Sequence, residues 1–562
     1  MKLLIVGGVA GGMSAATRAR RLDESAEIIV FEKGPHVSFA NCGLPYFIGG
    51  TIADRSELLV QTPERLRERF RLDVRTRHEV TGIDRAGHTV TVRDLESGRE
   101  YSENYHRLIL APGAVPIRPP IPGLDDDEVY VLRNIEDMDR IDAAAGRHSD
   151  GRAVVIGGGY IGLEMAENLT DRGLEVSVAE MLPQVMPVLD PEMAAPVHTE
   201  LRRHDVDLHL SNAVTEVQRQ GGRLHVLLQD ETELECDFAV LAVGVRPNTE
   251  LAEATGLALG STGGILVDEY LRTSDPDIYA VGDAIEVTDY VTGEPTLVPL
   301  AGPANRQGRI AADNVCGRQS TFRGTQGTGI VKVFGLTVAM TGANEKTLND
   351  LDIDCEEIYI HPASHAGYYP GAERMSGKLL FSPVDGRVLG AQITGGEGVD
   401  KRIDALAMAI QARMSVFDLE EAELAYAPPY GSAKDPVNMA GFVASNVLRG
   451  DLDIVHADEL DGRHTVLDVR SEREFQAGHI PGAVNIPLDE LRDRLDEIPQ
   501  DGPIAVACAV GLRAYLACRI LDQNGFDVAN VPGGYRTWRH SKPDEALEGS
   551  GDAEEFGEDV DD

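Results

Sequence analysis

The chain has 562 residues, too many for one hydrophobic core, and its 42% hydrophobic content is typical of globular packing. Its formal net charge of −41, from 93 acidic and 52 basic residues, disfavours a nucleic-acid partner. No apolar run approaches the roughly 20 residues that span a bilayer, so no membrane partner is expected. Six cysteines without a C-x-x-C pair or zinc spacing favour a reducing cytoplasm and predict no metal site.

The N-terminus predicts a dinucleotide-binding unit. An apolar strand over 2–6 leads into "GGVAGG" and a helical pattern over 13–22, which favours a strand over a signal peptide. The next strand, "AEIIVFEK", carries Glu32, 20 positions after Gly12. In such units the glycines form the turn, a pyrophosphate binds at the helix N-terminus and the carboxylate takes ribose hydroxyls. Val9 replaces the middle glycine of G-x-G-x-x-G, so this fingerprint is imperfect.

A second and more complete copy follows. "RAVVIGGGYIGLEMAENL" supplies Gly157, Gly159 and Gly162, and the next strand ends at Glu180. Two such units in one chain indicate two bound dinucleotides. The carboxylate of Glu180 favours NADH, with NADPH as the alternative, because it would repel the NADPH 2′-phosphate.

Three further strand-and-turn segments connect these units: "LILAPGAVP", "AVLAVGVRPN" and "TSDPDIYAVGDA". With them the chain resembles the pyridine nucleotide–disulfide oxidoreductases of the glutathione reductase fold. The resemblance implies an α/β protein with two Rossmann-like dinucleotide-binding domains for FAD and NADH, followed by an α+β dimerisation domain. In that family the Gly-Asp carboxylate, here Asp283, binds the FAD ribityl chain, and a tyrosine like Tyr160 covers the flavin until nicotinamide displaces it. The cofactor-binding residues predicted in this way are Gly7, Gly8, Ala10, Gly11, Gly12, Glu32, Lys33, Ala111, Gly157, Gly159, Tyr160, Ile161, Gly162, Glu180, Gly244 and Asp283.

Cys42 is the predicted redox centre. Pro45 suits the first turn of a helix, which would place Cys42 just ahead of a helix N-terminus that lowers the thiol pKa. A buried structural cysteine is the alternative. "SFANCGLPY" resembles the single-cysteine branch of the family: coenzyme A disulfide reductases, NADH peroxidases and NADH oxidases. The first glycine loop lacks the histidine of the peroxide-reducing members, which counts against a peroxidase. In coenzyme A disulfide reductases the cysteine forms a mixed disulfide with coenzyme A, so the second sulfur would come from the substrate.

The region from about 325 to 443 resembles the dimerisation domain of that branch, through "HAGYYPG" and "YAPPYGSAKDPVNMAG". The resemblance implies a homodimer in which Tyr368 and Tyr426 cross the interface to the cysteine sulfur. Tyr369 and Tyr430 are alternatives, and a packing role for these tyrosines also stays open. The coenzyme A contacts implied by the resemblance fall on Ser14, Arg18, Arg21, Ser38, Asn41 and Lys434.

The C-terminal part resembles a rhodanese domain, through "LDVRSEREFQAGHIPGAVNIP" and "ACAVGLRA". Cys508, Gly511 and Arg513 form C-x-x-G-x-R between a predicted strand and a predicted helix. Inward-pointing backbone N–H groups, together with the Arg513 cation, would stabilise a thiolate or persulfide. Ala514 stands where many relatives have Ser or Thr. Cys518 is predicted to pack in a helix, and Cys236, Cys316 and Cys355 to be structural.

These patterns predict the domain order of the whole chain. The expected segments are a first FAD part, an NAD domain, a second FAD part, a dimerisation domain, a linker, a rhodanese domain and an acidic disordered tail. Their expected boundaries are 1–112, 113–240, 241–322, 323–445, 446–462, 463–545 and 546–562.

The predicted function is FAD-dependent, NADH-consuming reduction of coenzyme A persulfide, polysulfide or coenzyme A disulfide at Cys42, with Cys508 carrying sulfane sulfur. A persulfide or polysulfide is favoured because a plain disulfide reductase needs no persulfide carrier. The alternative is an NADH oxidase whose rhodanese domain serves only as a docking or sensor module. The composition resembles that of haloarchaeal proteins, so a halophilic, cytoplasmic enzyme with a small sulfur substrate is expected.

Overall fold

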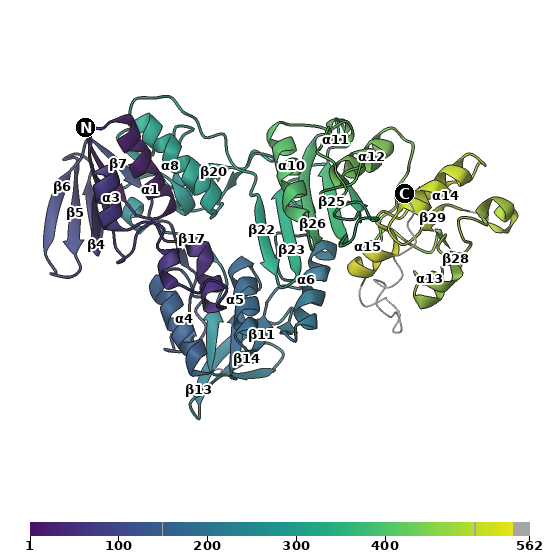
Figure 1. Ribbon diagram of the computed structural model, residues 1–562, viewed down its shortest axis with the longest axis horizontal. Coiled ribbons are helices and arrows are strands. Elements are labelled where there is room, and N and C mark those ends of the chain that lie inside the picture. Colours follow the sequence, from purple (N-terminus) through teal and green to yellow (C-terminus); the bar gives the residue numbers. More distant parts are fainter. Residues whose placement is uncertain (149, 500–501, 543–562) are drawn as a thin grey trace. The chain divides into compact units, whose positions relative to one another are not determined.

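The computed structural model describes residues 1–148, 150–499 and 502–542. The expected acidic tail, 546–562, lies outside these residues. The chain divides into two compact units (Figure 1). The first contains residues 1–186 and 201–327, and the second contains residues 187–200 and the chain from 328 onward.

Two five-stranded parallel sheets of the same design form the centre of the first unit. Each of the two glycine turns follows a central strand of its sheet, as the sequence predicts. Each turn leads into a helix, because the chain must cross over the sheet before the next strand can run parallel to the first. The first sheet has the order β19 (Ile278–Ala280), β7 (Arg107–Leu110), β1 (Lys2–Val6), β2 (Glu27–Glu32) and β3 (Asp73–Thr76). The second has the order β12 (Asp207–His209), β11 (Glu175–Ala179), β10 (Arg152–Ile156), β16 (Phe238–Leu241) and β9 (Val129–Tyr130).

Seven α-helices lie within the described part of the first unit. They are α1 (Ala10–Leu22), α2 (Leu44–Ile48), α3 (Pro63–Phe70), α4 (Ile135–Arg147), α5 (Tyr160–Asp171), α7 (Glu250–Ala254) and α8 (Ala301–Val315). Helix α1 packs against α8, which joins the first and last parts of the predicted FAD domain.

A separate three-stranded antiparallel sheet interrupts each parallel sheet along the chain. The one between β3 and β7 has the strands β4 (His78–Asp84), β5 (Thr89–Asp94) and β6 (Glu100–Asn104). The one between β12 and β16 has the strands β13 (Val214–Gln220), β14 (Arg223–Leu228) and β15 (Glu233–Cys236). The turns after "LILAPG" and "AVLAVG" pair directly as β8 (Ala114–Pro116) and β17 (Val245–Pro247). A small sheet combines β18 (Ile265–Leu266), β20 (Ile285–Thr288) and β21 (Pro295–Thr296).

The second unit begins with a five-stranded antiparallel sheet. Its order is β22 (Gly329–Val333), β23 (Leu336–Gly342), β26 (Val388–Gly395), β25 (Met375–Phe381) and β24 (Glu356–Ile360), so β24 is an edge strand. Helices α9 (Glu345–Asp350), α10 (Val399–Gln411), α11 (Val416–Glu420) and α12 (Pro436–Leu448) accompany it. Helix α10 packs on β23 and β26, and α12 packs beside β24.

The C-terminal module has a four-stranded parallel sheet with the order β28 (Val484–Asn485), β27 (Thr465–Asp468), β29 (Ile504–Ala507) and β30 (Val528–Asn530). Its helices are α13 (Glu472–Ala477), α14 (Leu512–Asp522) and α15 (Gly534–Ser541). The segment 446–462, expected as a linker, begins inside α12. Its Leu452 and Val455 are buried in the apolar clusters of this module.

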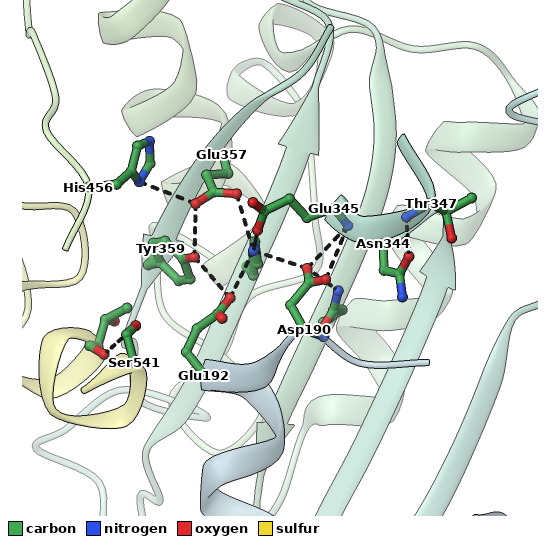
Figure 2. A network of polar contacts seen from close by, with 12 residues as sticks. Asp190, Glu192, Asn344, Glu345, Thr347, Glu357, Tyr359, His456 and Ser541 are labelled. Atoms are coloured by element: carbon green, nitrogen blue, oxygen red, sulfur yellow. Dashed lines mark hydrogen bonds and ion pairs between the residues drawn. The ribbon is translucent and has the colours of Figure 1, made fainter. Parts of the chain in front are cut away.

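A buried lysine joins distant parts of the second unit. The Lys378 ammonium, on β25, is inaccessible to solvent and lies 2.7–3.2 Å from four carboxylates. Figure 2 shows these carboxylates converging: Asp190, Glu192, Glu345 and Glu357. Asp190 and Glu192 lie at the start of α6 (Pro191–Arg203), which was expected within the NAD domain but whose residues up to 200 group with the second unit.

Across residues 1–148, 150–499 and 502–542, no helix is both long enough and apolar enough to cross a membrane.

We expect Lys378→Met to destabilise the second unit, because Asp190 and Glu192 would be left as buried charges without a counter-ion. Removing one partner of a buried ion pair costs about 3–5 kcal/mol. The measurement is the urea midpoint reported by the fluorescence of Trp538, the single tryptophan, which is buried in the same unit. The control is Lys332→Met on an exposed position of β22, and equal midpoints for the two variants would contradict the prediction.

Candidate active site

Both glycine turns are held by the acidic residue of the following strand. The Gly8 N–H donates to Glu32 Oε2 at 2.8 Å, and the Gly158 N–H donates to Glu180 Oε2 at 2.7 Å. Glu32 also accepts from Gly34, and burial raises the pKa of its carboxyl. The carboxylates predicted to bind ribose therefore also fix the turn. A carboxylate accepts about four hydrogen bonds, so lone pairs remain for ribose hydroxyls.

The turns have the form of pyrophosphate cradles. A Cβ on Gly12 would lie 1.9 Å from the Gly7 carbonyl oxygen, and one on Gly162 would lie 2.0 Å from that of Gly157, so helix and strand approach closely only because both residues are glycine. Helices α1 and α5 have no side-chain N-cap and no acidic residue in the first turn. Their first N–H groups are thus available to an anion, and both cradles fit a dinucleotide.

The other predicted cofactor residues lie in the same unit. Gly7 and Gly244 have φ of +102° and +104°, and the Ala111 N–H donates to the Val6 carbonyl in the first sheet. Asp283 lies in a single 3-10 turn after β19, where burial raises the pKa of its carboxyl. Lys33 is exposed and pairs with Glu79 at 2.7 Å.

Cys42 lies in a 3-10 turn over Asn41–Gly43, directly before α2, and Pro45 lies in the first turn of that helix as predicted. The residue as a whole is exposed, and its thiol is free. The predicted lowering of its pKa is wrong. Partial withdrawal of the thiol from water raises the pKa, and the carboxylates of Glu164 and Asp283 raise it further. Because α2 has only five residues, its dipole is too small to offset two nearby carboxylates.

Glu164 is a site residue that the sequence analysis did not single out. It follows Tyr160 by one turn of α5, is half-buried, and accepts a hydrogen bond from the Tyr46 hydroxyl at 3.4 Å. Burial raises its pKa to about 7, and burial also raises the pKa of Tyr160 to about 12. The sequence could have indicated Glu164 through its position. It lies two residues after Gly162 and four after Tyr160, so both side chains lie on the same face of the helix.

The predicted coenzyme A residues of the first unit lie on α1 and beside Cys42. Ser14, Arg18 and Arg21 occupy positions i, i+4 and i+7 of α1. Two of them already have partners on α8, because Arg18 pairs with Asp313 at 2.7 Å and the Ser14 hydroxyl donates to Asn305. Arg21 and Asn41 are exposed, and Ser38 has a left-handed backbone with φ of 47°. Lys434 is exposed in the second unit.

The two tyrosines chosen from the sequence meet. The hydroxyls of Tyr368 and Tyr426 are 2.8 Å apart, and both side chains are largely exposed. Tyr369 instead packs edge-on against His365. Tyr430 accepts a hydrogen bond from Lys401 through its carbonyl group. An exposed pair of phenols on the dimerisation domain offers proton donors to a neighbouring group.

Cys508 lies between β29 and α14, as predicted. Its thiol is buried, and Sγ accepts a hydrogen bond from the Gly511 N–H at 3.1 Å. The guanidinium of Arg513, which was expected to be a fixed cation beside Cys508, is bound bidentately to Glu474 at 2.6 and 2.8 Å. Burial alone would raise the pKa of Glu474, but hydrogen bonds from Arg513 and Ser471 lower it to about 2. Glu474 therefore offsets part of the positive charge of Arg513, which still interacts electrostatically with Cys508. Cys518 packs in the core of the module, as expected.

Comparisons with known proteins agree with this architecture. The family model for pyridine nucleotide-disulphide oxidoreductases matches residues 1–308, its dimerisation domain matches residues 328–436, and the rhodanese-like domain matches residues 453–541. The chain belongs to the pyridine nucleotide-disulphide oxidoreductase family.

Three relatives illustrate the match. A coenzyme A disulfide reductase from Staphylococcus haemolyticus is 37% identical over 79% of this chain and 100% of its own length. A crystal structure of reduced Bacillus anthracis CoADR-RHD has a TM-score of 0.95 and 49% identity, and covers 97% of this chain and 99% of that one. The structure of a NAD-dependent persulfide reductase from A. fulgidus has a TM-score of 0.91 and 40% identity, and covers 96% and 100%.

We expect Glu164→Gln to lower the pKa of the Cys42 thiol by about half a unit to one unit, because it removes a nearby negative charge. The effect should be seen above pH 7, where Glu164 is ionised. The measurement is the pH dependence of Cys42 alkylation by iodoacetamide, followed by mass spectrometry. Glu167→Gln, one turn further along α5, is the control, and an unchanged or raised thiol pKa in Glu164→Gln would contradict the prediction.

Proposed function

We propose that this chain is an FAD-dependent, NADH-consuming reductase of coenzyme A persulfide or polysulfide, and of coenzyme A disulfide. The observation that carries the proposal is the presence of two separate sulfur sites in one chain. Cys42 is solvent-accessible in the dinucleotide-binding unit, and Cys508 lies in a backbone loop that donates an N–H to its sulfur. Two relatives support this proposal: one is named a coenzyme A disulfide reductase, and the other a NAD-dependent persulfide reductase.

The two glycine cradles support a proposed assignment of the cofactors. Gly7, Gly8, Gly11, Gly12, Glu32 and Asp283 would hold FAD, while Gly157, Gly159, Gly162 and Glu180 would hold NADH in preference to NADPH. The chemistry that bound FAD would supply is acceptance of a hydride from NADH and an electron pair for reducing a disulfide at Cys42. The residues of the chain bind and orient these cofactors and the sulfur substrate.

Cys42 would form the covalent intermediate. Its thiolate attacks the coenzyme A sulfur of a persulfide, a Cys42–coenzyme A disulfide forms, the S–S bond of the substrate breaks, and hydrosulfide leaves. With coenzyme A disulfide the leaving group is coenzyme A thiolate. Two-electron reduction then breaks the mixed disulfide and returns Cys42 and coenzyme A as thiols or thiolates. Arg21 and Asn41 are exposed and would contact the coenzyme A portion.

Proton supply would come from two places. Glu164, with a pKa of about 7, can hold a proton near Cys42 at neutral pH. The hydrogen-bonded hydroxyls of Tyr368 and Tyr426 can donate to a leaving thiolate, and we propose that a homodimer brings them to the Cys42 site of the partner protomer. Cys508 would carry sulfane sulfur to or from that site. A cytoplasmic location and adaptation to high salt are part of this proposal.

An NADH oxidase with a docking or sensor rhodanese remains the alternative, and steady-state kinetics in molar salt separates the two. We expect NADH consumption with coenzyme A persulfide or disulfide to exceed that with oxygen by at least about tenfold. Cys42→Ser should lower it by about a thousandfold or more, because the nucleophile is lost. Cys508→Ser should abolish thiosulfate:cyanide sulfur transfer and leave coenzyme A disulfide reduction unchanged.

Cys518→Ala, which changes a buried packing cysteine of the same module, is the matched control for Cys508→Ser. NADH consumption as fast with oxygen alone as with the sulfur substrates would overturn the reductase. Sulfur transfer that survives Cys508→Ser would remove the carrier role of the rhodanese domain.

A further inference from the structure

Helix α15 binds the outer side of the Cys508 loop. The N–H groups of Tyr535 and Arg536, in its first turn, donate to the carbonyl groups of Cys508 and Ala509 at 2.7 and 3.2 Å. The approach is close, since a Cβ on Gly534 would lie 2.4 Å from the Cys508 carbonyl oxygen. In a planar trans peptide the N–H points opposite to the C=O. Holding these two carbonyl groups on the α15 side therefore turns the N–H groups of Ala509 and Val510 to the other side of the loop.

Backbone N–H groups that point into the loop stabilise a negatively charged sulfur there. The N–H of Gly511 already donates to Cys508 Sγ at 3.1 Å. Arg513 interacts electrostatically with Cys508, but its ion pair with Glu474 offsets part of its charge. Backbone N–H groups therefore have a large share in stabilising a thiolate or persulfide at Cys508, and α15 sets the directions of two of them, those of Ala509 and Val510.

The other side of α15 contacts the dimerisation domain. Residues 357, 359 and 361 alternate along the edge strand β24 and its end, so their side chains point to the same side. The His361 ring is buried and bridges two hydroxyls: Nδ1 lies 2.9 Å from Ser376 Oγ, and Nε2 lies 2.9 Å from Thr537 Oγ1 on α15. Two further contacts join the same strand to the C-terminal module. The backbone of Gly533 lies against Tyr359, and His456 Nδ1 lies 3.2 Å from Glu357 Oε1 (Figure 2).

We infer that His361 is a positioning residue for the Cys508 loop, acting through Thr537 and α15. Its ring anchors the helix, the first-turn amides of the helix hold the loop carbonyl groups, and the loop N–H groups are thereby aimed at the sulfur. The dimerisation domain thus completes the sulfur site of the rhodanese module. This inference deepens the proposed function, because it rests on Cys508 as the sulfur carrier.

The two ring nitrogens of His361 allow a sharp test. The amide of asparagine reaches the position of Nδ1, so His361→Asn keeps the Ser376 contact and loses the Thr537 contact. The amide of glutamine reaches the position of Nε2, so His361→Gln restores the bond to Thr537. Thr537→Val removes the same bond from the other side. His456→Gln, which removes a different contact of β24 with the C-terminal module and leaves the carboxylates around Lys378 in place, is the matched control.

The first measurement is hydrogen exchange of the full-length holoenzyme. We expect His361→Asn and Thr537→Val to speed exchange at the Tyr535 and Arg536 amides by about five- to tenfold, which corresponds to the loss of one buried hydrogen bond. His361→Gln and His456→Gln should stay within about twofold of the wild type. The double variant of His361→Asn with Thr537→Val should add nothing to either single variant, because both remove the same bond.

The second measurement is thiosulfate:cyanide sulfur transfer. We expect His361→Asn to lower kcat by about five- to tenfold with KM within about twofold, and His361→Gln to restore kcat. NADH-dependent reduction of coenzyme A disulfide should stay within about twofold in every variant.

Wild-type exchange and kcat in His361→Asn would overturn the inference. So would faster exchange spread equally over β27 and β29, which would show a general loss of stability. The carrier role of Cys508 in the proposed function is contradicted by a different result, namely sulfur transfer that survives Cys508→Ser. Hydrogen exchange at the Tyr535 and Arg536 amides tests the role of His361 independently of that result.

Discussion

The close contact between helix and strand at the two glycine turns is the constraint on which the first unit depends. A side chain at Gly12 or Gly162 would overlap a backbone carbonyl oxygen at about 2 Å, so each helix can point its first amides at a phosphate only with glycine there. The crossover at each turn then places the following strand in parallel beside the first, β2 beside β1 and β11 beside β10. The second turn also orients α5, the helix that carries Tyr160 and Glu164 on one face.

The two sulfur sites are built in opposite ways. At Cys42, partial withdrawal from water and the charges of nearby carboxylates raise the thiol pKa and favour its neutral form. At Cys508, the groups nearest the sulfur include a backbone N–H donor, and the neighbouring arginine is held by Glu474. The first arrangement suits a thiol that reacts only when bound groups change the local charge. The second suits storage of an anionic persulfide, because fixed dipoles stabilise charge without a mobile counter-ion.

The sequence predicted those features of the fold and of the site that depend on residues close together in the chain. The glycine turns, the short helix after Cys42 and the placement of Cys508 between β29 and α14 all depend on residues within one supersecondary unit. The charge around each thiol was not predictable, since it comes from residues brought together only by tertiary folding. Glu164 lies 118 residues from its partner Tyr46, and Glu474 lies 39 residues from Arg513. Lys378 is 186 residues from Glu192, so no periodicity or motif could indicate that buried pair.

The electrostatics of Cys42 also restrict the form in which a substrate sulfur can reach it. Glu164 and Asp283 repel a second anion, so a disulfide or a protonated persulfide approaches the thiol at lower cost than a persulfide anion or a polysulfide chain. The exposed Arg21 on α1 offers the opposite charge to phosphate groups farther from the sulfur. A substrate with an uncharged sulfur end and an anionic far end, as in coenzyme A derivatives, satisfies both conditions. An inorganic polysulfide lacks the uncharged sulfur end, so in the proposed function its sulfur would enter through the loop of backbone N–H groups around Cys508 and pass from there to the Cys42 site.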